Sequence, residues 1–470
     1  MIKREELAQR AGVFFDTHPE LVQIIEAIVG AGGRPLLVGG VVRDLFLERA
    51  PGDIDVEVYG LCTQGLETVL SSFGPVSLVG KSFGVLRLHG LDVDWSLPRT
   101  DSSGRHPDVM LNPKLSFKEA FRRRDLTINA MGIDCQSYEL IDEYGGYNDL
   151  EAGLLRAVDP DFFVEDPLRF FRVMQFLGRL NFKTDKMLDK VCAGMDVSGV
   201  ACERIEQELE KLMLYSSRPS LGWRWVRQIG RLKELFPELF ALTKTEQDPE
   251  WHPEGDVFEH SMQAIDVATS LKFGDSARKL AVMYGVLCHD LGKPATTKII
   301  EGRIHSRGHS EAGQKIARTF LRRFTRKKWL IDAVVKLVRY HMEPIIFVDA
   351  SDAAFRRLAY KCAPDTNLFE LALVSRADRS GRNKVGGKQL QKNVLQVDAF
   401  IERAKRLEVL YTIVRPLLLG KDLMGQVQPG PEMGAVLRRA YQMQIEHGIQ
   451  DRDELLKRAL QWYRQHAADA

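Results

Sequence analysis

Short apolar runs separated by polar turns dominate the first part of the chain, and this pattern predicts strands alternating with helices. Residues 1–34 predict a helical lead-in. An apolar strand then breaks at Gly39-Gly40, an amphipathic helix follows, and the chain returns as the strand-like run DIDVEVYG from residue 53. The run FGVLRLHG alternates as a half-buried strand does. We therefore expect a head domain that combines helices with a small mixed sheet.

The remainder of the chain predicts helices. Pro167 stands where a first helical turn would begin, because its missing N–H is not needed there. The runs DVFEHSMQAI and AVMYGVLCHDLGK are typical of helices, with Gly292 expected as the C-cap of the second. PGPEMG, at residues 429–434, is typical of a helix start. A helical region is therefore expected to follow the head.

Bulk composition indicates an ordinary globular protein. The 470 residues suffice for about two to four domains, and 28% charged with 44% hydrophobic residues is usual. A net charge of +2 means that RNA binding needs local basic patches. No apolar run approaches the roughly 18 residues of a membrane span. The N-terminus lacks a signal-peptide core, and six cysteines form no CxxC pair. We expect a cytoplasmic protein without a membrane partner.

Asp53 and Asp55 stand two positions apart in the strand-like run that follows the glycine turn. In a strand this spacing places both carboxylates on one face, where they repel unless a cation lies between them. Mg²⁺ binds carboxylate oxygens together with substrate phosphates, and a Gly-Gly turn lets backbone approach a ligand closely. These features predict a triphosphate site with two metals. The alternative interpretation is a solvated strand end.

A third carboxylate is expected from a neighbouring strand. Asp94 in LDVDWSLPR is the candidate and Asp92 is the second choice, while plain surface charges are the alternative for both. The next stretch, residues 99–118, is polar and rich in Gly, Pro and Ser, which predicts a mobile loop.

The string GGxVRD, with the two aspartates behind it, closely resembles the signature of the polymerase-beta-like nucleotidyltransferases. DWSLPRT and RRRDLTINAM extend the likeness to the class II tRNA nucleotidyltransferase and bacterial poly(A) polymerase family. The resemblance implies catalysis by Asp53, Asp55 and Asp94 with Mg²⁺. It also implies nucleotide contacts, to phosphate from Arg124 and to ribose from Asp125 and Asn129, within a set comprising Gly39, Gly40, Arg43, Arg124, Asp125 and Asn129.

Asp166 and Arg169 are three apart in EDPLRFFR, so on a helix they share a face. An acceptor and a forked donor side by side suit the Watson–Crick edge of cytosine or adenine. An intrahelical salt bridge is the commoner origin of such a pair. The string EDPLRxxR, however, resembles the nucleotide-selecting motif of the same family. The resemblance assigns base selection to Asp166 and Arg169, with Arg172 in support.

An ordered set of histidines and aspartates follows in the second half. His260, His289, Asp290 and Asp378 resemble the metal ligands of the HD phosphohydrolase superfamily, and further histidines lie at 305, 309 and 341. Mixed His and Asp ligands suit a transition metal such as Ni²⁺ or Mn²⁺. Some bacterial class II nucleotidyltransferases carry such a domain behind the head and neck. The alternative is a degenerate, purely structural copy.

The C-terminal stretch resembles the helical tail of the same enzymes. Lys421, Arg438 and Arg439 are candidates for gripping the acceptor arm of tRNA, although basic residues in a helical hairpin are common.

The predicted fold is α+β, with a polymerase-beta-like nucleotidyltransferase head followed by all-α neck, HD-type and tail domains. The expected boundaries are 1–135 for the head, 136–245 for the neck, 246–380 for the HD-type domain and 381–470 for the tail.

The predicted function is template-independent addition of CMP and AMP, from CTP and ATP, to the tRNA 3′ end. The terminal hydroxyl attacks the α-phosphate and pyrophosphate leaves. The alternatives are a CC-adding, A-adding or poly(A)-adding member of the family, an HD phosphohydrolase whose head mainly binds RNA, and a non-catalytic tRNA-binding protein. The sequence leaves the oligomeric state open.

Overall fold

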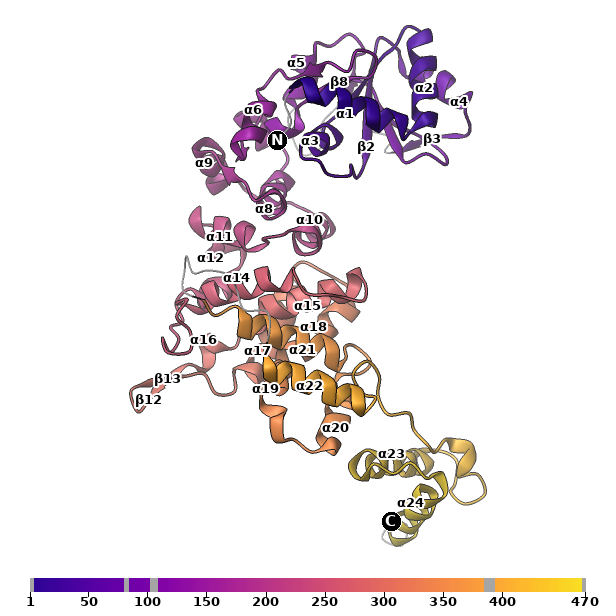
Figure 1. Ribbon diagram of the computed structural model, residues 1–470, viewed down its shortest axis with the longest axis vertical. Coiled ribbons are helices and arrows are strands. Elements are labelled where there is room, and N and C mark those ends of the chain that lie inside the picture. Colours follow the sequence, from indigo (N-terminus) through magenta and orange to yellow (C-terminus); the bar gives the residue numbers. More distant parts are fainter. Residues whose placement is uncertain (1–3, 80–83, 102–108, 384–393, 467–470) are drawn as a thin grey trace. The chain divides into compact units, whose positions relative to one another are not determined.

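The structure is a computed structural model that describes residues 4–79, 84–101, 109–383 and 394–466 (Figure 1). The chain forms two compact units, residues 1–208 and 209–470. Each unit is considered separately below.

The first unit is built on one mixed sheet. Among the described residues it has seven strands in the order β3-β4-β5-β2-β1-β8-β9. The bounds of its strands are β1 (Arg34–Val38), β2 (Ile54–Tyr59), β3 (Val76–Val79), β4 (Val85–Leu88), β5 (Val93–Ser96), β8 (Gly132–Asp134) and β9 (Leu140–Ile141).

Helices flank this sheet and continue beyond it (Figure 1). α2 packs against β1, α4 packs against β3 and β4, and α3 packs against β1 and β2. The bounds are α1 (Arg4–Asp16), α2 (Pro19–Gly30), α3 (Gly40–Phe46), α4 (Thr63–Ser71), α5 (Phe117–Arg122), η1 (Thr127–Asn129), α6 (Gly146–Ala152), α7 (Pro160–Phe163), α8 (Leu168–Leu180), α9 (Lys186–Gly194) and α10 (Cys202–Tyr215).

Strand register places the chemistry of the head at the centre of the sheet. β2 pairs with β1 in antiparallel fashion and with β5 in parallel fashion, and Asp55 lies opposite Asp94. β1 is buried along four of its five residues. It turns into α3 at Gly39, whose φ of 79° favours glycine. The glycine break seen in the sequence is thus the turn between the central strand and α3.

Two stretches differ in detail from expectation. The predicted mobile loop at 99–118 contains two paired strands, β6 (Arg99–Asp101) and β7 (Val109–Leu111), and its centre, residues 102–108, lies outside the described residues. The predicted neck is helical apart from β9 and the short parallel pair β10 (Leu154–Leu155) and β11 (Lys183–Thr184).

The second unit is helical apart from one hairpin, β12 (Lys298–Ile300) with β13 (Arg303–His305). The bounds of its helices are α11 (Ser220–Gln228), α12 (Leu232–Leu235), α13 (Pro237–Leu242), α14 (Val257–Ala268), α15 (Ser276–Cys288), α16 (Lys293–Thr296), α17 (His309–Leu321), α18 (Lys328–Tyr340), α19 (Glu343–Ile346), η2 (Phe347–Asp349), α20 (Asp352–Cys362), α21 (Leu368–Ser380), α22 (Leu395–Arg406), η3 (Gly420–Asp422), α23 (Pro431–His447) and α24 (Arg452–His466).

Four of these helices, α14, α15, α18 and α21, pack on one another and form the core of the second unit. Three of them begin at a residue whose side chain accepts a hydrogen bond from a backbone N–H in the first turn, namely Asp256, Asp275 and Asn367. Such caps satisfy donors that the helix itself leaves free. The caps fix where each helix starts and therefore which residues face the core.

Gly292 was expected to cap the helix before it, and this prediction is wrong. His289 is the C-cap of α15, and Gly292 has a φ of −82° at the start of α16. A Cβ at Gly292 would lie 2.0 Å from the carbonyl oxygen of His309. Glycine is needed here because the backbone of another helix approaches, and the left-handed conformation of a C-cap is not used.

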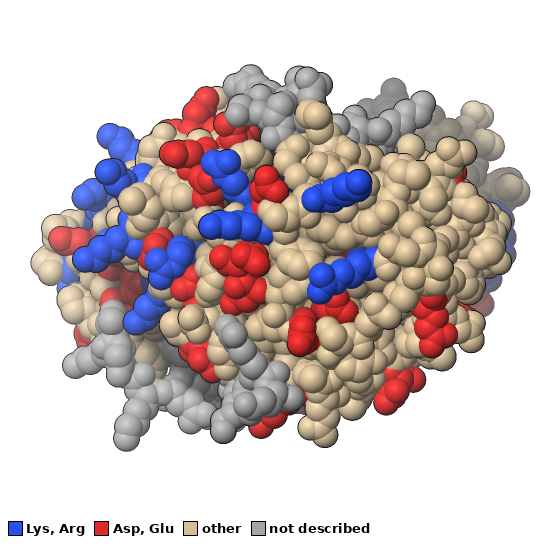
Figure 2. Space-filling model, turned by 90° about the horizontal axis from the view of Figure 1, so that it is seen from above, with Lys and Arg blue, Asp and Glu red and all other residues tan. Residues whose placement is uncertain are grey.

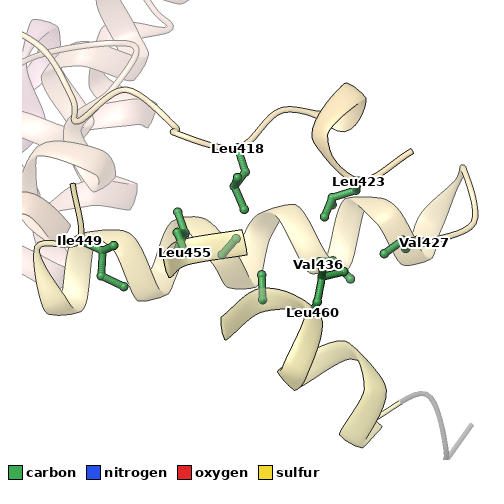
Figure 3. Close-up of a cluster of buried hydrophobic side chains, with 9 residues drawn as sticks. Leu418, Leu423, Val427, Val436, Ile449, Leu455 and Leu460 are labelled. Carbon is green, nitrogen blue, oxygen red and sulfur yellow. The ribbon is translucent and has the colours of Figure 1, made fainter. Parts of the chain in front are cut away.

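The last two helices enclose a hydrophobic cluster of their own. Side chains from the segment around η3 and from α23 and α24 converge on one another (Figure 3). Val436 and Leu455 are fully or almost fully buried within it. The predicted helix start at PGPEMG is confirmed, because α23 begins at Pro431.

The predicted fold class, a head with a small mixed sheet followed by helical regions, is confirmed. In the part of the chain that the structure describes, no helix has both the length and the apolar character needed to span a membrane. The six cysteines all lie in that part and form no disulfide.

Candidate functional sites

Three carboxylates gather at one edge of the central strands. Asp55 on β2 and Asp94 on β5 are direct neighbours across a parallel pair. Asp53 is exposed and lies one residue before β2, in the turn after Pro51-Gly52, so it is not part of the strand as expected. Burial raises the pKa of Asp55, Arg124 opposes the shift, and Asp94 and Asp53 add to it. Oxygen ligands that repel one another fit a hard divalent cation.

The backbone at Gly39 lies directly against the side chains of this site. A Cβ at Gly39 would lie 2.8 Å from Nη1 of Arg124 and 3.8 Å from Oδ2 of Asp55. The guanidinium of Arg124 therefore lies against the glycine turn and beside the carboxylates. Burial lowers the pKa of Arg124, and the charge of Glu57 opposes that change. A cation held so close to Asp55 is placed to meet a phosphate.

Glu57 is the anchor for this cation. It follows Asp55 by two positions on β2, so the two side chains share a face of the strand. Its side chain is fully buried and accepts hydrogen bonds from Nη2 of Arg123 at 2.9 Å and from the hydroxyl of Tyr59 at 2.8 Å. Nη2 of Arg124 lies 3.7 Å away. One buried carboxylate thus holds two arginines.

A hydrogen-bond chain links α3, η1 and α8. Arg43 Nη1 donates to Asn129 Oδ1 at 2.6 Å, and Asn129 Nδ2 donates to Asp125 Oδ1 at 3.0 Å. Arg172 Nε donates to Asp125 Oδ2 at 2.6 Å. Burial alone would raise the pKa of Asp125, but Arg172 and Asn129 outweigh it and hold the pKa well below its usual range. Four of the predicted nucleotide contacts therefore form one connected network.

Asp166 and Arg169 have different partners in this structure. Arg169 is buried and donates from Nη1 to the carbonyl of Phe162 at 2.8 Å and from Nη2 to the carbonyl of Arg123 at 2.5 Å. Asp166 is paired with Arg204 at 3.1 Å. Arg169 is thus fixed in orientation beside the arginine pair that Glu57 anchors.

Asp94 also has a partner from the neighbouring strand. Arg87 on β4 faces it across an antiparallel pair and donates to both carboxylate oxygens, with Nη2 at 3.1 Å from Oδ2. Arg87 is about half exposed, so solvent weakens this ion pair. Arg87 thus neutralises Asp94, the third carboxylate of the cluster.

The second unit holds a buried centre of histidines and aspartates. His260 on α14 lies with its Nε2 3.2 Å from Nε2 of His289 and 3.1 Å from Oδ1 of Asp378 on α21. Asp290 Oδ2 lies 3.2 Å from Nε2 of His289. Each of these four residues is at most 2% exposed. The predicted set is therefore brought together from two helices, α14 and α21, and the turn after α15.

Two more histidines adjoin this set. His309 and His341, which begin α17 and follow α18, have their Nε2 atoms 3.2 Å apart. Nε2 of His309 is 3.4 Å from Oδ1 of Asp290. Burial, with His289 and His309 nearby, lowers the pKa of His341 to about 3. The ring is therefore neutral and able to donate a lone pair.

The rings are all oriented in the same way. Nδ1 of His289, His309 and His341 donates to a backbone carbonyl three residues earlier, at 2.7 to 2.8 Å. Nδ1 of His260 donates instead to the fully buried Glu254 carboxylate at 2.8 Å. The Nε2 atoms of His289, His309 and His341 therefore carry lone pairs towards the centre, as metal ligands do, whereas Nε2 of His260 hydrogen-bonds to the Asp378 carboxylate.

Two cations of the chain contact the carboxylates of the centre. Lys293 Nζ lies 2.7 Å from Asp290 and Arg382 Nη2 lies 2.7 Å from Asp378. Both line a cavity of about 490 Å³, together with His309 and the half-exposed Trp251. The histidine and aspartate centre is thus accessible from one side, next to positive charge and an aromatic ring.

The tail candidates lie on or beside α23. Lys421 and Arg438 are exposed and Arg439 is partly buried. On the face of the molecule drawn in Figure 2, basic and acidic side chains lie interspersed. In the basic run at residues 322–328, Arg323 contacts Glu238 and Lys327 contacts Glu210.

Comparison with known proteins gives the family. Residues 36–156 match the model of the Poly A polymerase head domain, and residues 257–380 match the model of the HD domain. The multifunctional CCA protein of Xanthomonas euvesicatoria is 30% identical over 419 residues, which are 86% of this chain and 96% of that protein. The multifunctional CCA protein of Pasteurella multocida is 34% identical over 321 residues, 65% of this chain and 73% of that protein.

The chain belongs to the multifunctional CCA protein family. The predicted family is thereby confirmed, and both matched domain families are metal-dependent. A solved structure of the Bacillus stearothermophilus CCA-adding enzyme in complex with CTP superposes with a TM-score of 0.67 at 19% identity, covering 96% of this chain and 99% of that one. The Thermotoga maritima CCA-adding enzyme complexed with tRNA gives 0.55 at 20%, covering 93% of each. These likenesses show that the fold is shared.

Some residues that shape the two sites in this family member were not singled out from the sequence. Glu57 could have been noticed, because it continues the two-residue spacing of Asp53 and Asp55. His309 and His341 were noted but not assigned as ligands. Arg87 and Glu254 give no signal in the sequence, since their roles depend on strand pairing and on side-chain packing.

Proposed function

We propose that this protein adds CMP and AMP, from CTP and ATP, to the 3′ end of tRNA and so builds or repairs the CCA terminus. The observation that carries the proposal is the cluster of Asp55, Asp94, Gly39 and Arg124 at one sheet edge, in a member of the CCA family. The names of its relatives support the same substrates.

The roles at the head site follow from charge and position. Asp53, Asp55 and Asp94 would hold Mg²⁺, which when bound neutralises the carboxylates and polarises the triphosphate. Arg124, held against Gly39 by Glu57, contacts the phosphates. Asp125 accepts a hydrogen bond from the ribose hydroxyl, since its low pKa keeps it ionised. Burial of Asp125 strengthens its contacts.

We assign base selection to Asp166 and Arg169, beside Arg172 at the start of α8. Two backbone carbonyls accept hydrogen bonds from Arg169, so its guanidinium is fixed in orientation before a nucleotide arrives. A fixed donor and acceptor favour cytosine and adenine over bases with the opposite pattern. The predicted domains, 1–135, 136–245, 246–380 and 381–470, serve as head, neck, HD-type and tail domains. In the tail, Lys421, Arg438 and Arg439 contact the tRNA backbone.

We further propose that the HD-type domain is a metal-dependent phosphohydrolase. The favouring observation is that four histidines, three of them buried and His309 partly buried, direct their Nε2 atoms at two carboxylates beside a cavity lined by Lys293 and Arg382. Mixed nitrogen and oxygen donors fit Ni²⁺ or Mn²⁺. The absence of a disulfide among the six cysteines agrees with action in the cytoplasm.

The test uses three tRNA transcripts that end before CCA, after the first C, and after CC. Each is incubated with Mg²⁺ and labelled CTP or ATP, and product lengths are read on a gel. We expect all three to grow to a full CCA end and then stop. Growth that ends at CC, growth of the last transcript alone, or unlimited AMP addition would replace the proposal with a partial or poly(A)-adding enzyme. No growth would leave the HD-type activity as the main function.

A further inference from the structure

We propose that a cavity of the second unit, between the starts of α15 and α21, is a binding site for a guanine nucleotide. The cavity has a volume of about 320 Å³, which suits a small ligand. No described residue lines both this cavity and the one beside the histidine centre. The inference is therefore independent of the CCA addition and the phosphohydrolase activity proposed above.

Aromatic rings form one wall of the cavity. The ring centroids of Phe369 and Tyr411 lie 5.3 Å apart, with 52° between the ring planes, and Phe273 lines the same cavity. The backbone N–H of Phe369 donates to the carbonyl of Leu410 at 3.1 Å, which ties the segment that carries Tyr411 to the start of α21. Tyr411 is nevertheless 60% exposed. An exposed ring that the backbone holds in place offers a face on which a base can stack.

A buried carboxylate lies at the back of the cavity. Glu370 on α21 is 3% exposed, and its Oε2 accepts a hydrogen bond from the hydroxyl of Thr366 at 2.6 Å. Its Oε1 accepts from Nδ2 of Asn367 at 2.8 Å. Arg278 Nη1 lies 3.4 Å from Oε1 and 3.5 Å from Oε2, which is longer than a normal hydrogen bond. Each carboxylate oxygen therefore retains capacity to accept from a ligand.

Two adjacent acceptors select among the bases. The Watson–Crick edge of guanine carries two adjacent donors, N1–H and the 2-amino group. Adenine and cytosine place one donor beside an acceptor, and uracil places one donor between two acceptors. A carboxylate offers acceptors alone, so guanine is the base that can donate to both of its oxygens. Burial raises the pKa of Glu370, while Thr366 and Arg278 oppose that change. Two donors from a base would compensate the buried charge further.

Basic side chains complete the site. Lys272 and Arg278 both line the cavity, and both are exposed. Their charges disfavour a cationic ligand and attract a phosphate. Because the contacts of Arg278 with Glu370 are long, little interaction is lost when its guanidinium turns towards a phosphate. Stacking, two donors and an anionic group together describe a guanine nucleotide, either free or as an unpaired residue of an RNA.

The experiment measures binding of labelled GMP to the full chain by equilibrium dialysis in the presence of EDTA. The chelator keeps metal ions from the head and from the HD-type domain, so the nucleotide is not consumed. We expect a single class of site with one GMP per chain. Unlabelled AMP, CMP and UMP should displace labelled GMP about 5- to 140-fold less well than unlabelled GMP does, because they lack the second matched donor.

Substitutions in the cavity locate the bound nucleotide. Tyr411→Ala should weaken GMP binding by about 5- to 140-fold through loss of stacking, whereas Tyr411→Phe should bind as the wild type does. Glu370→Gln should weaken GMP binding and remove the preference over AMP, since an amide has one acceptor in place of two. Lys272→Ala should weaken binding of GMP and leave that of guanosine unchanged.

Tyr360→Ala is the matched control, because Tyr360 on α20 is 51% exposed and lies outside the cavity. Its affinity for GMP should equal that of the wild type. Circular dichroism checks that each variant is folded, and Tyr411→Ala, at an exposed position, keeps the test decisive if Glu370→Gln does not fold.

The oligonucleotides UUUGUU and UUUUUU distinguish the two sources of guanine. Displacement of GMP by UUUGUU alone would identify a guanine of RNA as the occupant, and displacement by neither would identify the free nucleotide; both results support the guanine site. Equal displacement by the two oligonucleotides, or by AMP and GMP, would overturn the choice of guanine. Absence of GMP binding, or unchanged binding in folded Tyr411→Ala, would overturn the site itself.

Discussion

Replacing Glu57 with glutamine tests whether one buried carboxylate positions the phosphate-binding arginine. The change preserves the shape of the side chain and removes only its charge. Glu57 is fully buried and lies 2.9 Å from Nη2 of Arg123 and 3.7 Å from Nη2 of Arg124. When the charge of Glu57 is removed, Arg123 and Arg124 lose the carboxylate that both contact, close to Asp55.

The magnitude follows from those contacts. A hydrogen bond to a charged group contributes about 1.5–3 kcal/mol, and breaking a buried ion pair from one side costs about 3–5 kcal/mol. Because glutamine still accepts a hydrogen bond, we expect the low end of this range. The free energy of unfolding of the head should fall by about 3 kcal/mol. If Arg124 loses one charge-assisted contact to the phosphates, kcat/KM falls by about 10- to 150-fold at 1.36 kcal/mol per tenfold.

The assay is single-nucleotide extension of a tRNA transcript ending in CC, with ATP varied at a temperature where circular dichroism shows the variant to be folded. We expect kcat to fall more than KM rises, since the arginine acts mainly on developing phosphate charge. Glu67→Gln, an exposed glutamate on α4 of the same head, is the matched control and should leave both constants unchanged.

Wild-type kcat/KM in the folded Glu57→Gln protein would refute the positioning role, even if its melting temperature were lower. In that case Glu57 would serve stability alone. An equal fall of kcat/KM in the Glu67→Gln control would show that the effect is not specific to Glu57. The positioning role assigned to Glu57 would then also be refuted.

Four further outcomes are expected. Asp53→Ala should abolish nucleotide transfer while tRNA binding, measured by filter retention, stays within about twofold; retained transfer would exclude the two-metal assignment. Arg87→Ala should lower the Mg²⁺ concentration for half-maximal transfer by up to about fivefold, because solvent screens a half-exposed ion pair and keeps its contribution small; an increased requirement would contradict this. His289→Ala should abolish phosphoester hydrolysis but not CCA addition, and the reverse pattern would favour a phosphohydrolase with an RNA-binding head. Asp125 has a pKa below its ordinary value, so its ion pair with Arg172 is stabilising above about pH 4 and is lost as pH falls further; melting temperatures from pH 5 to pH 2 should fall more steeply for wild type than for Asp125→Asn, and parallel curves would refute the linkage.

Local sequence pattern was sufficient to predict which head residues lie together, because they stand near strand ends and turns that the hydrophobic pattern marks. Gly39, Asp55 and Asp94 are each next to a strand end or turn that the hydrophobic pattern marks, and the strand register puts the two carboxylates side by side. The strand was predicted to begin at Asp53, one residue too early, because Asp53 lies in the turn that precedes β2. Arg87 could not be predicted, since its partner is set by which strand lies beside β5.

The composition of the histidine centre, in contrast, could not be predicted from local sequence pattern. His289-Asp290 is visible as a dipeptide, yet the residues that complete it come from helices far apart in the chain, and nothing local says which histidines converge. His305 and His309 looked equivalent in the sequence. The structure separates them, because Gly292 lets the start of α17 approach the HD turn and so brings only His309 to Asp290. A glycine interpreted from the sequence as a helix cap therefore decides, through close packing, which histidine lies beside the aspartate.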